Sequence, residues 1–81
     1  MTKTYKIRKH RGRLLYAPVV TEVNLKSACE KANAECYGFH PNYEVYEYTD
    51  NKLSNVYQIR VVKPQFFARV GLQTLMKQLK I

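Results

Sequence analysis

A chain of 81 residues, 46% of them hydrophobic and 25% charged, is large enough for one small domain and too apolar for a disordered segment. It has no apolar run near the roughly 20 residues that span a membrane and no signal-like segment, so we expect a single cytoplasmic domain over residues 1–81. The net charge of +8 favours a polyanionic partner such as nucleic acid or an acidic protein surface.

The first expected element is a β-hairpin over residues 2–20. Its turn signal is His10-Arg11-Gly12, because Gly12 suits the left-handed position of a three-residue loop. This loop pairs Lys9 with Arg13, Arg8 with Leu14, Ile7 with Leu15, Lys6 with Tyr16, and Tyr5 with Ala17. One face then holds Tyr5, Ile7, Leu15, Ala17 and Val19, and the other holds Lys6, Arg8, Leu14 and Tyr16. Pro18 donates no ladder hydrogen bond, so the second strand should be an edge strand or bend there.

The positive charge is concentrated in this hairpin. Residues 1–13 contain no acidic side chain, and their basic side chains are Lys3, Lys6, Arg8, Lys9, Arg11 and Arg13. These six charges leave eight basic and six acidic residues for the rest of the chain, a net charge of only +2. A basic block of this kind usually contacts a polyanion, although it can also simply keep a protein soluble.

A helix is expected between Asn24, a good N-cap, and Gly38, which suits the left-handed position after a helix end. Its apolar stripe consists of Leu25, Ala28, Cys29, Ala32 and Cys36. The two cysteines lie roughly 10 Å apart along a helix axis at about 1.5 Å per residue, which is too far for a disulfide. The same separation argues against a metal site shared with His10 or His40. We therefore predict buried free thiols, no metal and no cofactor.

Alternating aromatic and β-branched residues from Asn42 to Lys63 predict a central hairpin. A three-residue loop of Asp50, Asn51 and Lys52 separates the two faces better than a two-residue turn of Asp50 and Asn51. It pairs Thr49 with Leu53, Glu47 with Asn55, Val45 with Tyr57, and Tyr43 with Ile59. The core face then holds Tyr43, Val45, Leu53, Tyr57, Ile59 and Val61. The other face holds Glu44, Tyr46, Tyr48, Ser54, Val56, Gln58, Arg60 and Val62.

After Pro64 the chain predicts a second helix, with an apolar stripe formed by Ala68, Leu72, Leu75, Met76 and Leu79. Two interpretations remain open, because Phe66, Phe67 and Val70 project from roughly the opposite side. Either the helix begins only after Gly71, or it is apolar on two faces. In the second case these three residues would form a partner surface or a homodimer surface.

These elements predict an α+β two-layer sandwich of order ββαββα, with a four-stranded antiparallel sheet and both helices on one face. The predicted buried residues are Tyr5, Ile7, Leu15, Val19, Leu25, Cys29, Ala32, Val45, Ile59, Leu72, Leu75 and Leu79. The second face of the sheet would be open or covered by another molecule.

Cations and aromatic rings meet on that second face, and this combination is typical of surfaces that stack on unpaired bases and neutralise phosphates. The sequence therefore predicts a small basic module that binds nucleic acid, with single-stranded DNA or RNA favoured. Glu44 on the same face and the general preference of tyrosine for strands argue the other way. The candidate binding residues are Lys6, Arg8, Lys9, Arg11, Arg13, Tyr16, Tyr46, Tyr48, Gln58 and Arg60.

The alternative function is a protein-binding adaptor or inhibitor, of the kind that small viral or plasmid genes encode, whose basic surface docks on an acidic partner. No residue pattern indicates a catalytic site. Small basic ribonucleases can work with His, Arg, Lys and Tyr alone, so His10 and His40 leave that alternative open. Both histidines fit turn or loop positions better than the position of a general base, so we do not expect an enzyme.

Overall fold

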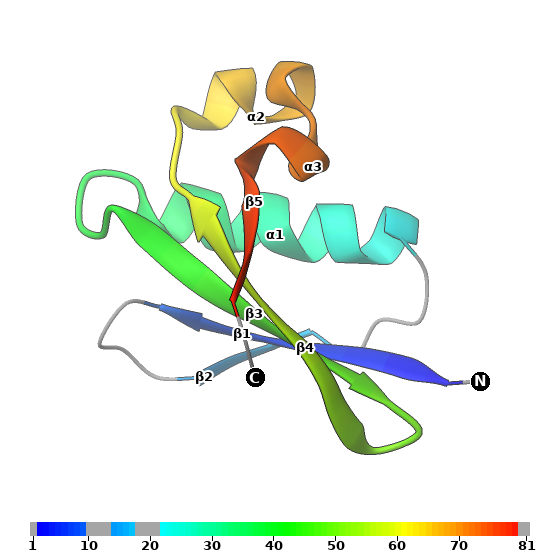
Figure 1. Ribbon diagram of the computed structural model, residues 1–81. Helices are drawn as coiled ribbons and strands as arrows, with labels where there is room; N and C mark the ends of the chain where they lie inside the picture. The colour runs from blue at the N-terminus through cyan, green and yellow to red at the C-terminus, as the bar shows by residue number, and fades with distance from the viewer. Residues whose placement is uncertain (1, 10–13, 18–21, 80–81) are drawn as a thin grey trace.

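The computed structural model describes residues 2–9, 14–17 and 22–79, with the side chains of residues 2–8 and 25–79. In chain order the elements are β1 (Lys3–Lys9), β2 (Leu14–Ala17), α1 (Glu22–Cys36), β3 (Asn42–Thr49), β4 (Lys52–Arg60), α2 (Pro64–Val70), α3 (Leu72–Leu75) and β5 (Met76–Leu79). The strands form one antiparallel sheet in the order β2-β1-β3-β4-β5. Figure 1 shows α1 lying along the sheet, with α2 and α3 on the far side of α1 from β1 and β2. The protein is therefore of the α+β class.

The register predicted for the first hairpin is confirmed wherever the structure describes it. Arg8 faces Leu14, Ile7 faces Leu15, Lys6 faces Tyr16, and Tyr5 faces Ala17. β2 is an edge strand, as the proline after it requires. The predicted Lys9–Arg13 pair, the turn at residues 10–12, Pro18 and Val19 lie outside the described residues.

The central hairpin has the two-residue turn, which we did not predict, together with the strand register that we predicted from a three-residue loop. Asp50 and Asn51 alone form the turn, and both have positive φ, 50° and 67°, so the predicted three-residue loop is wrong. A β-bulge then restores the register between Glu47 and Tyr48. Below the bulge, Glu47 faces Asn55, Val45 faces Tyr57, and Tyr43 faces Ile59, as predicted.

Ser54 is the extra residue of this bulge. Its hydroxyl donates to the Glu47 carbonyl at 3.1 Å and to Glu47 Oε1 at 3.2 Å. The bulge places Leu53 opposite Tyr48 rather than Thr49, so the prediction that Leu53 lies on the core face is wrong. Val62 is also misassigned, because the chain leaves the sheet after Arg60 and Val62 packs against the core.

The hydrophobic core lies between α1, the adjacent sheet face and the C-terminal helices. Its buried members are Tyr5, Ile7, Leu25, Cys29, Ala32, Cys36, Tyr43, Val45, Ile59, Phe67, Leu72 and Leu75. The side chains of Leu15 and Val19, which we also predicted to be buried, are not described. Leu79 is only half-buried, because it pairs with Val56 on the opposite face of the sheet.

Two polar side chains tie α1 to the rest of the core. The Tyr43 hydroxyl donates to the Cys29 carbonyl at 3.0 Å, which connects β3 to the helix. Asn33, fully buried on α1, bonds to the backbone of Val62. The helix begins at Glu22, so the predicted N-cap at Asn24 is wrong. Gly38 has the expected positive φ, 86°.

The predicted order ββαββα is not confirmed, because the segment after Pro64 is not one helix. Pro64 does begin α2, but Gly71 adopts φ 81° and ψ 138° and separates α2 from α3. Met76 to Leu79 then form β5, which pairs with β4 through Ile59–Met76 and Val56–Leu79. Residues that we assigned to one helical stripe are therefore divided between two short helices and a fifth strand.

Candidate functional site

The sheet face that points away from α1, called the open face below, carries its side chains in rows across the strands. One row contains Lys6, Tyr46, Val56 and Leu79, which face one another in successive strands. It is called the apolar row below after its last three members. The polar row, two residues further along each strand, contains Arg8, Glu44, Gln58 and Lys77. The backbone of Tyr16 in β2 extends the apolar row. The rows lie about 7 Å apart, since a strand rises about 3.4 Å per residue.

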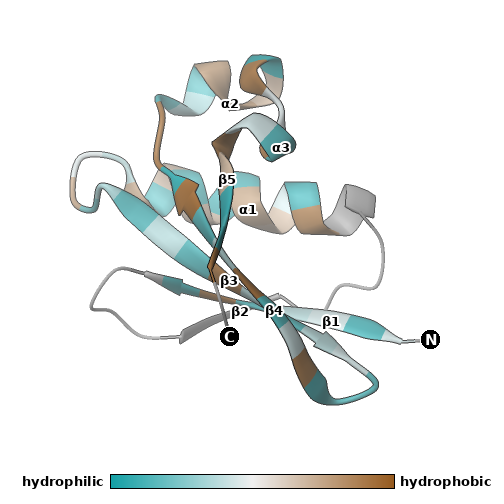
Figure 2. Ribbon diagram, in the orientation of Figure 1, coloured by the Kyte–Doolittle hydropathy of each residue, from teal (hydrophilic) through white to brown (hydrophobic). Residues whose placement is uncertain are grey.

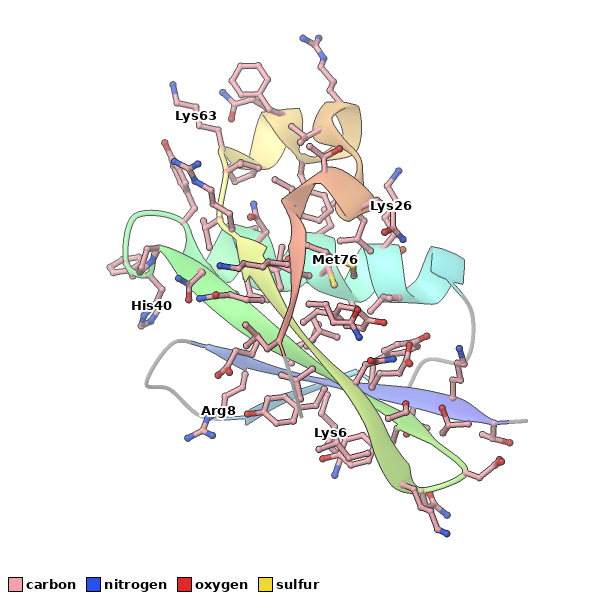
Figure 3. All side chains as sticks on the ribbon, viewed as in Figure 1. Lys6, Arg8, Lys26, His40, Lys63 and Met76 are labelled. Atoms are coloured by element: carbon pink, nitrogen blue, oxygen red, sulfur yellow. The ribbon has the colours of Figure 1, made fainter. Side chains whose placement is uncertain are left out.

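Positive charge predominates on this face. Its described basic side chains are Lys6, Arg8, Arg60 and Lys77, all exposed, and its described carboxylate is Glu44. The outer surface of α1, in contrast, carries exposed charges of both signs from Lys26, Glu30, Lys31 and Glu35. In Figure 3, Lys6 and Arg8 point away from α1, while Lys26 lies on the opposite side of the molecule.

Aromatic rings on the open face are held in place by their neighbours. Lys6 Nζ lies 5.3 Å from the centroid of the Tyr48 ring, a cation–π contact. Tyr46 is half-buried in the apolar row beside Val56, which is only 7% exposed although it lies outside the core cluster. Figure 2 shows β3 and β4 banded with hydrophilic and hydrophobic residues. This face therefore has an apolar centre with a charged margin.

Six of the ten predicted binding residues are brought to this face with described side chains. They are Lys6, Arg8, Tyr46, Tyr48, Gln58 and Arg60. Lys9 and Tyr16 are described only in their backbone, and Arg11 and Arg13 lie outside the described residues. Sequence reasoning missed Lys77 and Leu79, because it placed both in a helix.

The predicted partner surface on the second helix requires a correction. Phe67 is fully buried in the core, so it cannot contact a partner, and Val70 is half-buried against the same core. Phe66 remains 41% exposed, with the Arg69 guanidinium carbon 5.9 Å from its ring centroid. The side chains of α2 therefore supply no second apolar face, and they do not support a homodimer through this helix.

A cleft, called the corner cleft below, opens where the open face meets α3. It has a volume of about 400 Å³ and is lined by Pro41, Asn42, Gln58, Arg60, Thr74, Leu75, Met76 and Lys77. Two of these lining residues are basic and none is acidic. The buried Oδ1 of Asn42 has no hydrogen-bond partner.

A second cleft lies on the helix side of the sheet and has a different character. It is lined by Lys3, Tyr5, Leu25, Glu47, Tyr57, Leu72, Gln73 and Met76, with a volume of about 360 Å³. The Glu47 carboxylate, which accepts hydrogen bonds from Ser54 and Asn55, is buried in this cleft. Burial and the charge of Glu47 raise the pKa of the Tyr57 hydroxyl. A buried carboxylate makes this cleft unsuitable for a phosphate.

Reactive side chains do not gather elsewhere in the described part of the chain. Cys29 and Cys36 are free and buried. Burial raises the pKa of the Cys29 thiol to about 12, partly offset by the neighbouring Tyr43 hydroxyl. No group of three or more His, Cys, Asp or Glu side chains among the described residues could hold a metal ion. His10 lies outside those residues, and His40 is half-buried in the loop after α1.

Exposed aromatic residues that the sequence did not predict also occur just before β3. Phe39 is 83% exposed and Tyr37 43% exposed, in the turn that follows α1.

None of the described helices is long and apolar enough to cross a membrane. Comparison with protein-family models, with curated proteins and with solved structures found no match.

Proposed function

We propose that this protein binds single-stranded nucleic acid, DNA or RNA, on the open face of its sheet. The observation that carries the proposal is the adjacency of the two rows. Tyr46 and Val56 form the centre of an apolar surface, and in the next row Arg8 and Lys77 lie on either side of Glu44 and Gln58. Unpaired bases stack on aromatic rings while nearby cations neutralise the phosphates that connect them.

The aromatic rings and the cations of the open face would contribute to binding in different ways. Each base stacked on an aromatic ring contributes about 1–3 kcal/mol, so Tyr46 and Tyr48 would together supply much of the affinity. Each phosphate neutralised on a single strand instead contributes about −0.7 to the slope of log affinity against log salt concentration. Arg8, Lys6 and Lys77 would set this salt dependence.

The competing function is a protein-binding adaptor or inhibitor that presents the same face to an acidic partner. It is supported by the apolar residues at the centre and edge of the open face, since Leu53 is 41% exposed opposite Tyr48. The two functions differ in what the tyrosines do. Only the nucleic-acid function requires Tyr46 and Tyr48 for binding of single strands.

Fluorescence anisotropy with labelled single-stranded DNA and RNA, at four salt concentrations, tests the proposal. Arg8→Ala should weaken binding to every sequence and reduce the salt slope by about 0.7. Tyr46→Ala and Tyr48→Ala should each weaken binding roughly fivefold to a hundredfold and leave the slope unchanged, because stacking releases no counterions. Lys26→Ala, on the far side of α1, is the matched control and should bind like the wild type.

The thermal melting of each variant shows whether it is folded at the assay temperature. Folded Tyr46→Ala and Tyr48→Ala variants that bind single strands as tightly as the wild type would contradict the proposal. The adaptor function would then be favoured.

A further inference from the structure

We propose that the corner cleft binds the terminal phosphate of a nucleic-acid strand that lies on the open face. This inference rests on the proposed function, because the strand has to occupy the open face for its end to reach the cleft. It goes further by assigning one end of the ligand to named residues. The cleft is formed by the last part of β4, the start of β3 and the junction of α3 with β5.

The two cations of the cleft are placed to share one anion. Lys77 faces Gln58 across the β4–β5 pair, and Arg60 follows Gln58 by two residues on the same face. Lys77 and Arg60 are therefore diagonal neighbours, a relationship that places Cβ atoms roughly 7–8 Å apart or slightly less. Both side chains are exposed and long enough to meet at a common phosphate, which an arginine can hold through two parallel hydrogen bonds.

Neutral polar groups of the cleft can complete the coordination of this phosphate. Asn42 faces Arg60 across the β3–β4 pair, and its buried Oδ1 has no hydrogen-bond partner. The same amide carries an Nδ2 donor, which can bond a phosphate oxygen in the cleft. Thr74 of α3, exposed at the same cleft, adds a hydroxyl donor.

The charge of the cleft favours a terminal phosphate over an internal one. A phosphate monoester carries about −1.5 to −2 at pH 7, whereas an internal phosphodiester carries a single charge. The lining supplies Arg60 and Lys77 and no acid. Glu44 faces Gln58 from β3 and is, like Lys77, a diagonal neighbour of Arg60, but it does not line the cleft. Thr74 of α3 lines the cleft beyond these β-strands.

The test compares three oligonucleotides of one sequence that carry a 5′-phosphate, a 3′-phosphate or no terminal phosphate. We expect one of the two phosphorylated forms to bind the wild type about three- to tenfold more tightly than the unphosphorylated form at low salt. Arg60→Gln and Lys77→Gln should each remove most of this advantage. Arg8→Gln is the matched control, because it removes the same charge from the same face outside the cleft, and it should weaken all three forms equally.

The outcomes separate this inference from the function on which it rests. Equal binding of all three oligonucleotides by the wild type would overturn the terminal-phosphate site and leave the proposed function intact. The same conclusion would follow if Arg60→Gln and Lys77→Gln weakened all three forms equally, as we expect of Arg8→Gln. If none of the three oligonucleotides binds, the proposed function and this inference are both overturned.

Discussion

Asn33 of α1 and Val62 of the segment after β4 hold each other by two hydrogen bonds. Asn33 Nδ2 donates to the Val62 carbonyl at 2.7 Å, and the Val62 N–H donates to Asn33 Oδ1 at 3.0 Å. Asn33 is 0% exposed, and the amide nitrogen and oxygen of this buried side chain both bond to the backbone of Val62. This pair fixes the point at which the chain leaves the sheet on its way to α2.

Asn33→Ala should lower the free energy of unfolding by about 2–4 kcal/mol. The substitution leaves the N–H and the carbonyl of Val62 without partners, and each unpaired buried group costs about 1–3 kcal/mol. Urea denaturation measures the change. Lys31→Ala, an exposed position on the same helix, should change stability by no more than about 0.5 kcal/mol. Equal midpoints for the two variants would show that the Asn33–Val62 pair does not stabilise the fold.

Stability should fall as the pH rises above about 9. Burial raises the pKa of the Cys29 thiol from 9.0 to about 12, so over this interval the unfolded chain binds fewer protons than the folded one. The contribution of this group is present below pH 9 and is lost toward pH 12, at a rate of up to about 1.4 kcal/mol per pH unit. Burial raises the pKa of Tyr43 as well, which adds a loss of the same sign.

Urea denaturation of the wild type and Cys29→Ala at pH 8, 9.5 and 10.5 isolates the thiol. The variant should show a shallower loss of stability with pH, because Tyr43 and Tyr57 still contribute their parts and the thiol does not. The readout is the slope with pH, so any constant loss from the substitution itself does not matter. Parallel slopes for the two proteins would exclude Cys29 as a cause.

Gly71→Ala should destabilise the protein by about 1–3 kcal/mol, which is the typical cost of a backbone conformation that residues with side chains avoid. Gly71 has φ 81° and ψ 138°, and a Cβ added there meets no atom within 4 Å. The cost is therefore one of backbone conformation and not of packing. Thermal melting followed by circular dichroism measures it, with Gln73→Ala at an exposed α3 position as the control. A Gly71→Ala variant as stable as this control would contradict the argument.

Local sequence patterns were sufficient to predict most of the sheet and its open face. The hairpin registers depend on short turns and on a two-residue alternation, both of which lie within about twenty neighbouring positions. The Lys6–Tyr16 pair follows from them. The Val45–Tyr57 pair also depends on the bulge at Ser54, which keeps the predicted register although the turn is one residue shorter than predicted. The positions of Arg8 and Tyr46 on a common face then need only the period of a strand.

The C-terminal region could not be predicted in the same way, because its structure depends on distant partners. Leu72, Leu75, Met76 and Leu79 have helical spacing, yet Met76 and Leu79 pair with Ile59 and Val56 of β4. A strand of four residues carries too little periodicity to compete with that pattern. Lys77 was missed as a member of the open face for the same reason.

The extra residue at Ser54 lets the central hairpin change its length without exchanging its faces. Without Ser54 the ladder would be regular, with Tyr48 still opposite Leu53 and Glu47 still opposite Asn55. The loss of one turn residue would be compensated in the same way if Ser54 joined the ladder. Gln58 and Arg60 stay on the open face in both cases, so the hairpin tip is free to drift in length during evolution while the faces below Glu47 are kept.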